Sequence, residues 1–220
     1  MKTPILHHVP AARGFRILWL LHEMGIKPDL KLYRISDGSL RDPEFLGVSP
    51  AGRVPALEID GTTIYESGAI TEYLCETRAE HGLGRAPGDP ERIPFLEALH
   101  FAETQACILA NLNLQWIFLR PVEARSPALL KIEAARLAAT LKPLERLLGD
   151  REFILESGFS GADTMLGYNL MAAPYFVRFD KFPNLRAYWD RMQARPAFQA
   201  AKEQDGPQEF YTQDFYEVSQ

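Results

Sequence analysis

The fold of this chain is decided by the stretch RVPALEIDGTTIYESGAI, which spans residues 53–70. Two short apolar runs flank an Asp-Gly pair, and this pattern predicts a β-hairpin over residues 56–65. Pro55 precedes the hairpin, although proline is normally kept out of sheet interiors because it cannot donate to the ladder. Ser67 follows the hairpin, and we expect its hydroxyl to cap a helix that runs to about residue 78.

The residues before this hairpin alternate between strand and helix patterns. Residues 5–9 and 30–35 predict strands, residues 15–25 predict an amphipathic helix, and residues 42–49 predict a short helix. The resulting order is β-α-β-α-β-β-α. Two strands joined through a helix should pair in parallel, with a right-handed crossover. We therefore expect a small mixed sheet with helices on both faces.

The character of the sequence changes after residue 80. Residues 81–92, HGLGRAPGDPER, are rich in glycine and proline and predict a linker. The runs that follow have helical spacing and lie at residues 91–119, 127–148, 160–178 and 183–204. We predict an α/β domain over residues 1–80 and an all-helical domain over residues 93–220. Its tail carries four aromatic side chains and is either frayed or folded back over a groove.

The composition argues against several classes of protein. The chain has 220 residues, a net charge of −5 and no run rich in lysine or arginine, which argues against a nucleic-acid partner. No stretch approaches the ~20 apolar residues of a membrane span, and the N-terminus lacks the apolar region of a signal peptide. Cys75 and Cys107 have no zinc-type spacing and predict a pair of buried free thiols in a reducing compartment. We expect a cytoplasmic protein without a metal or a membrane partner.

A ligand site is indicated where the hairpin meets the next helix. A helix N-terminus presents N–H groups and a positive dipole end that attract a carboxylate. Ser67 adds a donor there, and ionised Glu66 suits an ammonium group. Considered alone, Ser67 would be a plain helix cap and Glu66 a solvated surface charge. Together they fit the carboxylate and the ammonium of an amino-acid head group. Arg53 could hold a second carboxylate. A cis Val54-Pro55 bond would leave the Val54 backbone free to pair with a short peptide.

Three segments resemble the cytosolic glutathione S-transferase family, particularly its bacterial members. VSPAGRVPALEIDGTTIYESGAITEYL resembles the glutathione-binding half of the family. GFSGADTML resembles its helix-capping motif, in which Ser160 caps a helix and Asp163 returns a bond to the Ser160 N–H. HFAETQ, residues 100–105, is similar to bacterial members. The resemblance implies a thioredoxin-like N-terminal domain and a C-terminal helical bundle.

The resemblance also implies a function and a set of site residues. Val54, held by Pro55, would pair with the cysteinyl part of glutathione, Glu66 and Ser67 would hold the γ-glutamyl head, and Arg53 would approach the glycyl end. Glutathione would be the co-substrate, and its sulfur would be transferred to a small hydrophobic electrophile in a detoxifying homodimer without a metal. The alternative is a non-catalytic module of this fold that binds ligands or partner proteins.

The catalytic residue of the family is missing from its expected place. Family members stabilise the glutathione thiolate with a Tyr, Ser or Cys near the end of the first strand or the start of the first helix. That region, HHVPAARGFR at residues 7–16, contains none of them. Three substitutes remain open: backbone N–H groups of residues 11–13, the permanent cation of Arg13, and His7 or His8. These two histidines should point to opposite faces of the sheet.

Overall fold

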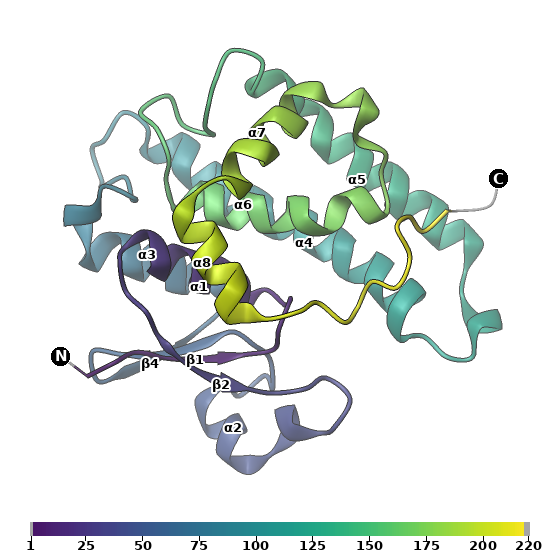
Figure 1. The fold of residues 1–220 in the computed structure, drawn as a ribbon, viewed down its shortest axis with the longest axis horizontal. Helices are drawn as coiled ribbons and strands as arrows, with labels where there is room; N and C mark the ends of the chain where they lie inside the picture. The colour runs from purple at the N-terminus through teal and green to yellow at the C-terminus, as the bar shows by residue number, and fades with distance from the viewer. Residues whose placement is uncertain (1, 218–220) are drawn as a thin grey trace. The chain divides into compact units, whose positions relative to one another are not determined.

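The computed structural model describes residues 2–217, and its chain is traced in Figure 1. Backbone contacts divide it into two compact units. The N-terminal unit comprises the residues up to Asp89 together with Gln193–Gln208. The C-terminal unit comprises Pro90–Met192 together with the residues from Glu209 onward. The domain boundaries at residues 81–92 stay a prediction, but the contacts group the last helix of the chain with the N-terminal unit.

A four-stranded mixed sheet forms the centre of the N-terminal unit, in the spatial order β2-β1-β3-β4. Its strands are β1 (Ile5–His8), β2 (Asp29–Leu32), β3 (Ala56–Ile59) and β4 (Thr62–Tyr65). β1 pairs in parallel with β2 and antiparallel with β3, which forms the predicted hairpin with β4. Asp60 and Gly61 in the hairpin turn have φ of 53° and 78°. Positive φ at both central residues is the requirement of a two-residue hairpin turn of type I′.

Helices cover both faces of this sheet, as predicted. The helices of the unit are α1 (Gly14–Glu23), α2 (Pro43–Val48), α3 (Ser67–Thr77) and α8 (Pro196–Asp205). Helix α2 lies on one face of the sheet, and α1, α3 and α8 lie on the other (Figure 1). Phe198 of α8 packs edge-on against Phe15 and Trp19 of α1, with ring centroids 5.4 and 5.0 Å apart. Arg195 donates two hydrogen bonds of 2.7 Å to the carboxylate of Glu23.

The C-terminal unit is helical, as predicted, but one predicted helix is wrong. Its helices are α4 (Arg92–Asn113), α5 (Pro127–Leu147), α6 (Gly161–Ala172) and α7 (Pro183–Gln193). The run at residues 183–204 predicted one helix, whereas the structure has α7 and α8 there. Pro196 causes the break, because a residue before proline is disfavoured in the helical region. Arg195 is accordingly extended, with φ −67° and ψ 132°.

The aromatic tail is folded back onto the C-terminal unit as far as the structure describes it. Tyr211 stacks on Tyr175 with ring centroids 4.0 Å apart. Its hydroxyl donates to Asn113 Oδ1 at 3.2 Å, and burial raises the pKa of this tyrosine. Tyr216 packs against Trp116, with ring centroids 5.4 Å apart. Of the two alternatives left open by the sequence, the described part of the tail therefore follows the folded one.

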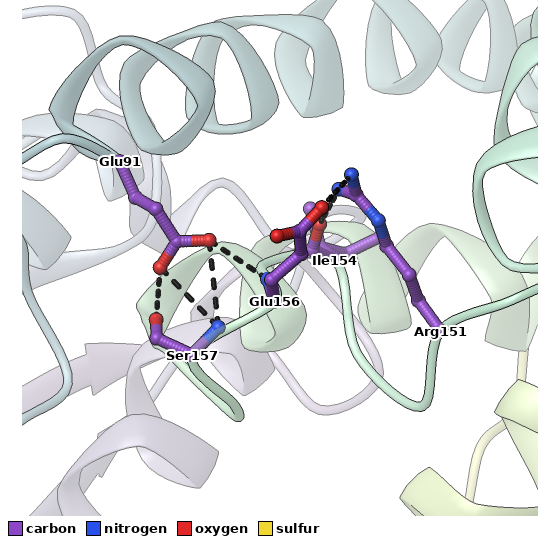
Figure 2. A network of polar contacts seen from close by, with 5 residues as sticks. All are labelled: Glu91, Arg151, Ile154, Glu156 and Ser157. Atoms are coloured by element: carbon purple, nitrogen blue, oxygen red, sulfur yellow. Dashed lines mark hydrogen bonds and ion pairs between the residues drawn. The ribbon is translucent and has the colours of Figure 1, made fainter.

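A loop after α5 is fastened to the start of α4 by a polar network (Figure 2). Glu91 accepts the backbone N–H groups of Glu156 at 2.8 Å and of Ser157 at 3.3 Å, together with the Ser157 hydroxyl. Arg151 donates to Glu156 at 2.5 Å and to the Ile154 carbonyl at 3.5 Å. One carboxylate just before α4 thus organises a loop about 65 positions later in the chain.

The predicted capping box at the start of α6 is present and belongs to a larger buried network. Ser160 and Asp163 exchange the two bonds of the box, with the Ser160 N–H 2.8 Å from Asp163 Oδ2. Asp163 Oδ1 also accepts the Ile154 N–H at 3.1 Å and the Tyr188 hydroxyl at 2.9 Å. Burial raises the pKa of this carboxyl, while the four donors around it act in the opposite direction.

None of the helices within residues 2–217 combines the length and the apolar character needed to cross a membrane.

The buried network around Ser160 and Asp163 allows a prediction about stability. Ser160→Ala removes one cap and should lower the free energy of unfolding by about 1 kcal/mol. Asp163→Ala strands several buried donors at once and should lower it by about 3 kcal/mol. Urea unfolding followed by circular dichroism measures both variants. An Asp163→Ala variant no less stable than Ser160→Ala would contradict the structural role of this carboxylate.

Candidate functional site

The first part of the candidate site is the loop that leads into β3. The Val54-Pro55 peptide bond is cis, as predicted. Pro55 is buried, Val54 is half-buried and the Arg53 side chain is exposed. The buried Ser49 shapes this loop, because its hydroxyl donates to the Arg53 carbonyl at 2.7 Å and lies 3.4 Å from the Arg53 N–H. Ser49 is a residue that the sequence interpretation did not single out.

The second part of the site is the start of α3, where the expected cap is wrong by one position. Glu66 occupies the capping position, and Ser67 is the first residue of the helix. Glu66 has φ 76° and ψ 116°, a conformation that an L-residue adopts at a cost of the order of 1–3 kcal/mol. This conformation accounts for the shift, because Glu66 leaves the strand sharply and the helix begins one residue later. The Glu66 side chain is exposed, whereas Ser67 is buried.

A buried arginine supports Ser67 from behind. Arg16 of α1 is fully buried, and its Nη1 donates to the Ser67 hydroxyl oxygen at 3.1 Å. A permanent cation at this place adds to the positive end of the α3 dipole. The sequence interpretation missed Arg16, although a lone charge within the apolar run FRILWLL was a usable signal. The start of α3 therefore offers donors and positive charge to an anion, with an exposed carboxylate beside them.

The two candidate histidines point to opposite faces of the sheet, as predicted. His7 Nδ1 lies 2.8 Å from the Tyr33 hydroxyl and its Nε2 lies 2.7 Å from Glu58. Burial raises the pKa of Tyr33, which keeps its proton available to His7. Both ring nitrogens of His7 are thus hydrogen-bonded on the face of the sheet that α2 covers. His8 is buried on the other face and contacts Asp205.

The loop between β1 and α1 carries the remaining candidates. Ala11 has φ 59°, in the left-handed region that costs an L-residue about 1–2 kcal/mol. Its N–H donates to Asp205 Oδ2 at 3.1 Å, and the Ala12 N–H donates to the Val9 carbonyl at 3.0 Å. Two of the backbone N–H groups suggested for thiolate binding are therefore used inside the protein. Arg13 is half-buried and occupies the capping position of α1.

Within residues 2–217, no cluster of three or more His, Cys, Asp or Glu side chains is arranged to hold a metal ion.

Fold and site define the class of protein: a thioredoxin-like unit with a candidate anion site at α3, followed by a helical unit. Two family models agree with this architecture. Residues 13–77 match the glutathione S-transferase N-terminal domain, and residues 116–205 match the glutathione S-transferase C-terminal domain. The chain belongs to the glutathione S-transferase family.

Individual relatives are similar over most of the chain. Glutathione S-transferase F13 of Arabidopsis thaliana is 27% identical over 195 residues, which cover 83% of this chain and 87% of the relative. A solved glutathione transferase from Methylococcus capsulatus is 29% identical, covers 92% of this chain and 98% of its own, and has a TM-score of 0.79. A sphingomonad glutathione S-transferase complexed with glutathione is 27% identical, with coverages of 91% and 98% and a TM-score of 0.80.

The contact between Arg16 and Ser67 can be tested without any ligand. We expect Arg16→Met and Ser67→Ala to be coupled by about 1.5 kcal/mol in a double-mutant cycle, because the hydrogen bond has a charged donor. Chemical unfolding of the wild type, both single variants and the double variant gives the coupling energy. If the losses of unfolding free energy in the two single variants add up to the loss in the double variant within ~0.5 kcal/mol, the contact is contradicted.

Proposed function

We propose that this chain is a glutathione transferase that conjugates glutathione to a small hydrophobic electrophile. The observation that carries the proposal is the start of α3, where Glu66 and Ser67 lie side by side and buried Arg16 donates to Ser67. Family membership and the glutathione complex of the sphingomonad relative support the same ligand. The binding residues proposed are Arg53, Val54, Pro55, Glu66 and Ser67.

The chemistry of these groups matches the two ends of glutathione. The α3 N-terminus and the Ser67 hydroxyl suit the γ-glutamyl carboxylate, and the exposed Glu66 carboxylate suits the neighbouring ammonium. Arg53 suits the carboxylate of the glycyl end. The backbone of Val54 suits the cysteinyl part, which would lie beside it like an added strand. These contacts would hold the sulfur near the loop between β1 and α1.

The proposed reaction needs a thiolate. The thiol proton leaves to solvent, the sulfur electron pair forms a bond to an electrophilic carbon, and the leaving group departs with its bonding pair. The chain would contribute positioning of the sulfur and positive potential from the start of α1, including Arg13. Catalysis by His7 has less support, because both of its ring nitrogens are hydrogen-bonded.

Calorimetry with glutathione tests the proposal. We expect a dissociation constant between micromolar and millimolar, or about 4–8 kcal/mol of binding free energy. Glu66→Ala and Ser67→Ala should each weaken binding several-fold, because each removes a partner of the γ-glutamyl head. Glu76→Ala, an exposed change at the far end of α3, serves as the control. The absence of heat at millimolar glutathione would overturn the proposal, and binding without conjugation of any electrophile class would favour a non-catalytic module.

We also propose a homodimer, a cytoplasmic location and a role in detoxification. Cys75 and Cys107 form no disulfide in the structure, which supports a reducing compartment. Cys75 is buried, as predicted, but the prediction is wrong for Cys107, which is exposed. A cavity of about 660 Å³ beside α4 and the end of α5 supports association, because most of its lining is apolar. Its side chains include Pro94, Phe101, Leu144, Leu147 and Ile154. The proposed interface also includes His100, which lines the same cavity, and Glu103.

Light scattering tests the dimer. At micromolar concentration we expect twice the chain mass of 24.9 kDa. Phe101→Glu should shift the mass toward one chain, because a charge in an apolar interface is not compensated. Leu32→Glu, at an exposed position of the N-terminal unit, is the control and should leave the mass unchanged. A wild-type protein of one chain mass would contradict the proposal.

A further inference from the structure

A buried carboxylate joins the last helix of the N-terminal unit to its first strand. Asp205 is the final residue of α8, and His8 is the final residue of β1; they are 6% and 0% exposed. Asp205 Oδ1 accepts from His8 Nε2. The same carboxylate accepts the Ala11 N–H, with Oδ2 at 3.1 Å and Oδ1 at 3.4 Å. One side chain therefore fastens the strand end, the helix end and the loop that leads into α1.

Asp205 holds a turn that its own sequence disfavours. Ala11 lies in the left-handed region at φ 59°, which alanine rarely adopts. The Ala12 N–H donates to the Val9 carbonyl at 3.0 Å, and the Ala12 carbonyl accepts from Phe15 at 3.0 Å. The turn thus runs directly into α1. The peptide N–H of this strained residue is anchored by a charge-assisted hydrogen bond to Asp205.

The arrangement gathers several unfavourable features in one place. A carboxylate at the C-terminus of a helix faces the negative end of the dipole. His8 Nδ1 is buried and has no hydrogen-bond partner among the described residues. Gly14 is needed to admit the imidazole, because a Cβ there would lie 2.1 Å from His8 Nδ1. Burying such a pair also carries a desolvation penalty that the mutual attraction need not repay. Local features that the fold does not need collect at functional sites.

Helix α8 is docked firmly enough to place Asp205 accurately. At its start, Arg195 makes the two hydrogen bonds to Glu23. Near its end, Gln204 Nε2 donates to the Pro28 carbonyl at 2.8 Å, and Gln204 Oε1 lies 2.7 Å from His22 Nε2. These contacts fix α8 along α1 without touching the loop at Ala11.

We propose that Asp205 and His8 are positioning residues for glutathione conjugation, an inference that rests on the proposed function. By holding Ala11, they set the direction in which Arg13 and the N-terminus of α1 meet the glutathione sulfur. Asp205 acts through the backbone and not by contact with the sulfur. In this chain the buried Asp205 and His8 therefore hold in place the loop before α1. Arg13 and the N-terminus of α1 then take the part of the missing Tyr, Ser or Cys.

The test measures the bound thiol directly. Ultraviolet absorbance of the glutathione complex against pH gives the pKa of the thiol, and steady-state kinetics with an aryl halide give kcat and KM. For Asp205→Asn and His8→Gln we expect a higher thiol pKa and a kcat lower by about 10- to 100-fold. The KM for glutathione should change less than about twofold, because the α3 site is untouched. Arg13→Ala should raise the thiol pKa by a similar amount.

Two further variants separate positioning from mere stability. Gln204→Ala loosens α8 without touching the loop, so it should lower the melting temperature and leave the thiol pKa unchanged. Ala11→Gly removes the left-handed penalty and, combined with Asp205→Asn, should restore part of kcat. If Asp205→Asn alone folds poorly, the thiol pKa and kcat are measured on this double variant instead.

A wild type that does not bind glutathione overturns the proposed function and this inference together. A wild type that conjugates, with Asp205→Asn equal to it in thiol pKa and kcat, overturns only the inference.

Discussion

Burial of α1 is the constraint on which the rest of the N-terminal unit depends. Every residue of Gly14–Leu21 is buried, so the helix has no solvent face along that stretch. A helix buried all round must satisfy its polar side chains with neighbours. Arg16 does so through Ser67 at the start of α3, which brings a cation to the candidate anion site. The buried stretch includes Phe15 and Trp19, whose rings pack edge-on against Phe198 of α8.

The candidate site is therefore assembled from elements that are remote in the chain and joined by α1. Arg16 reaches α3, and the loop before α1 is held by Asp205, 194 positions later in the sequence. Binding and activation of glutathione would then depend on different anchors. The γ-glutamyl end would depend on α3, and the sulfur end would depend on the turn at Ala11. Separate anchors allow affinity and thiolate stability to vary independently.

Local patterns allowed much of this fold to be predicted. The hairpin followed from Asp60-Gly61, and the capping box followed from Ser160 and Asp163, because the signals lie within a few residues. Contacts between distant segments left no such pattern, so the partnership of Asp205 with His8 was not predictable. The cap at Ser67 was misplaced because the unusual φ of Glu66 has no sequence signature. The break before Pro196 was predictable, because a residue that precedes proline disfavours the helical conformation. It was missed because the apolar residues on both sides of the break keep helical spacing.

Gly14 has a consequence for how this loop could evolve. Any side chain there would collide with His8 Nδ1, because its Cβ would lie 2.1 Å from that atom. A serine at this position, which would return a hydroxyl to the helix start, is therefore incompatible with the present imidazole. The histidine would have to be lost first, and with it the hydrogen bond between His8 Nε2 and the Asp205 carboxylate. Positions 8 and 14 are therefore sterically coupled, and a side chain at position 14 requires a second change at His8.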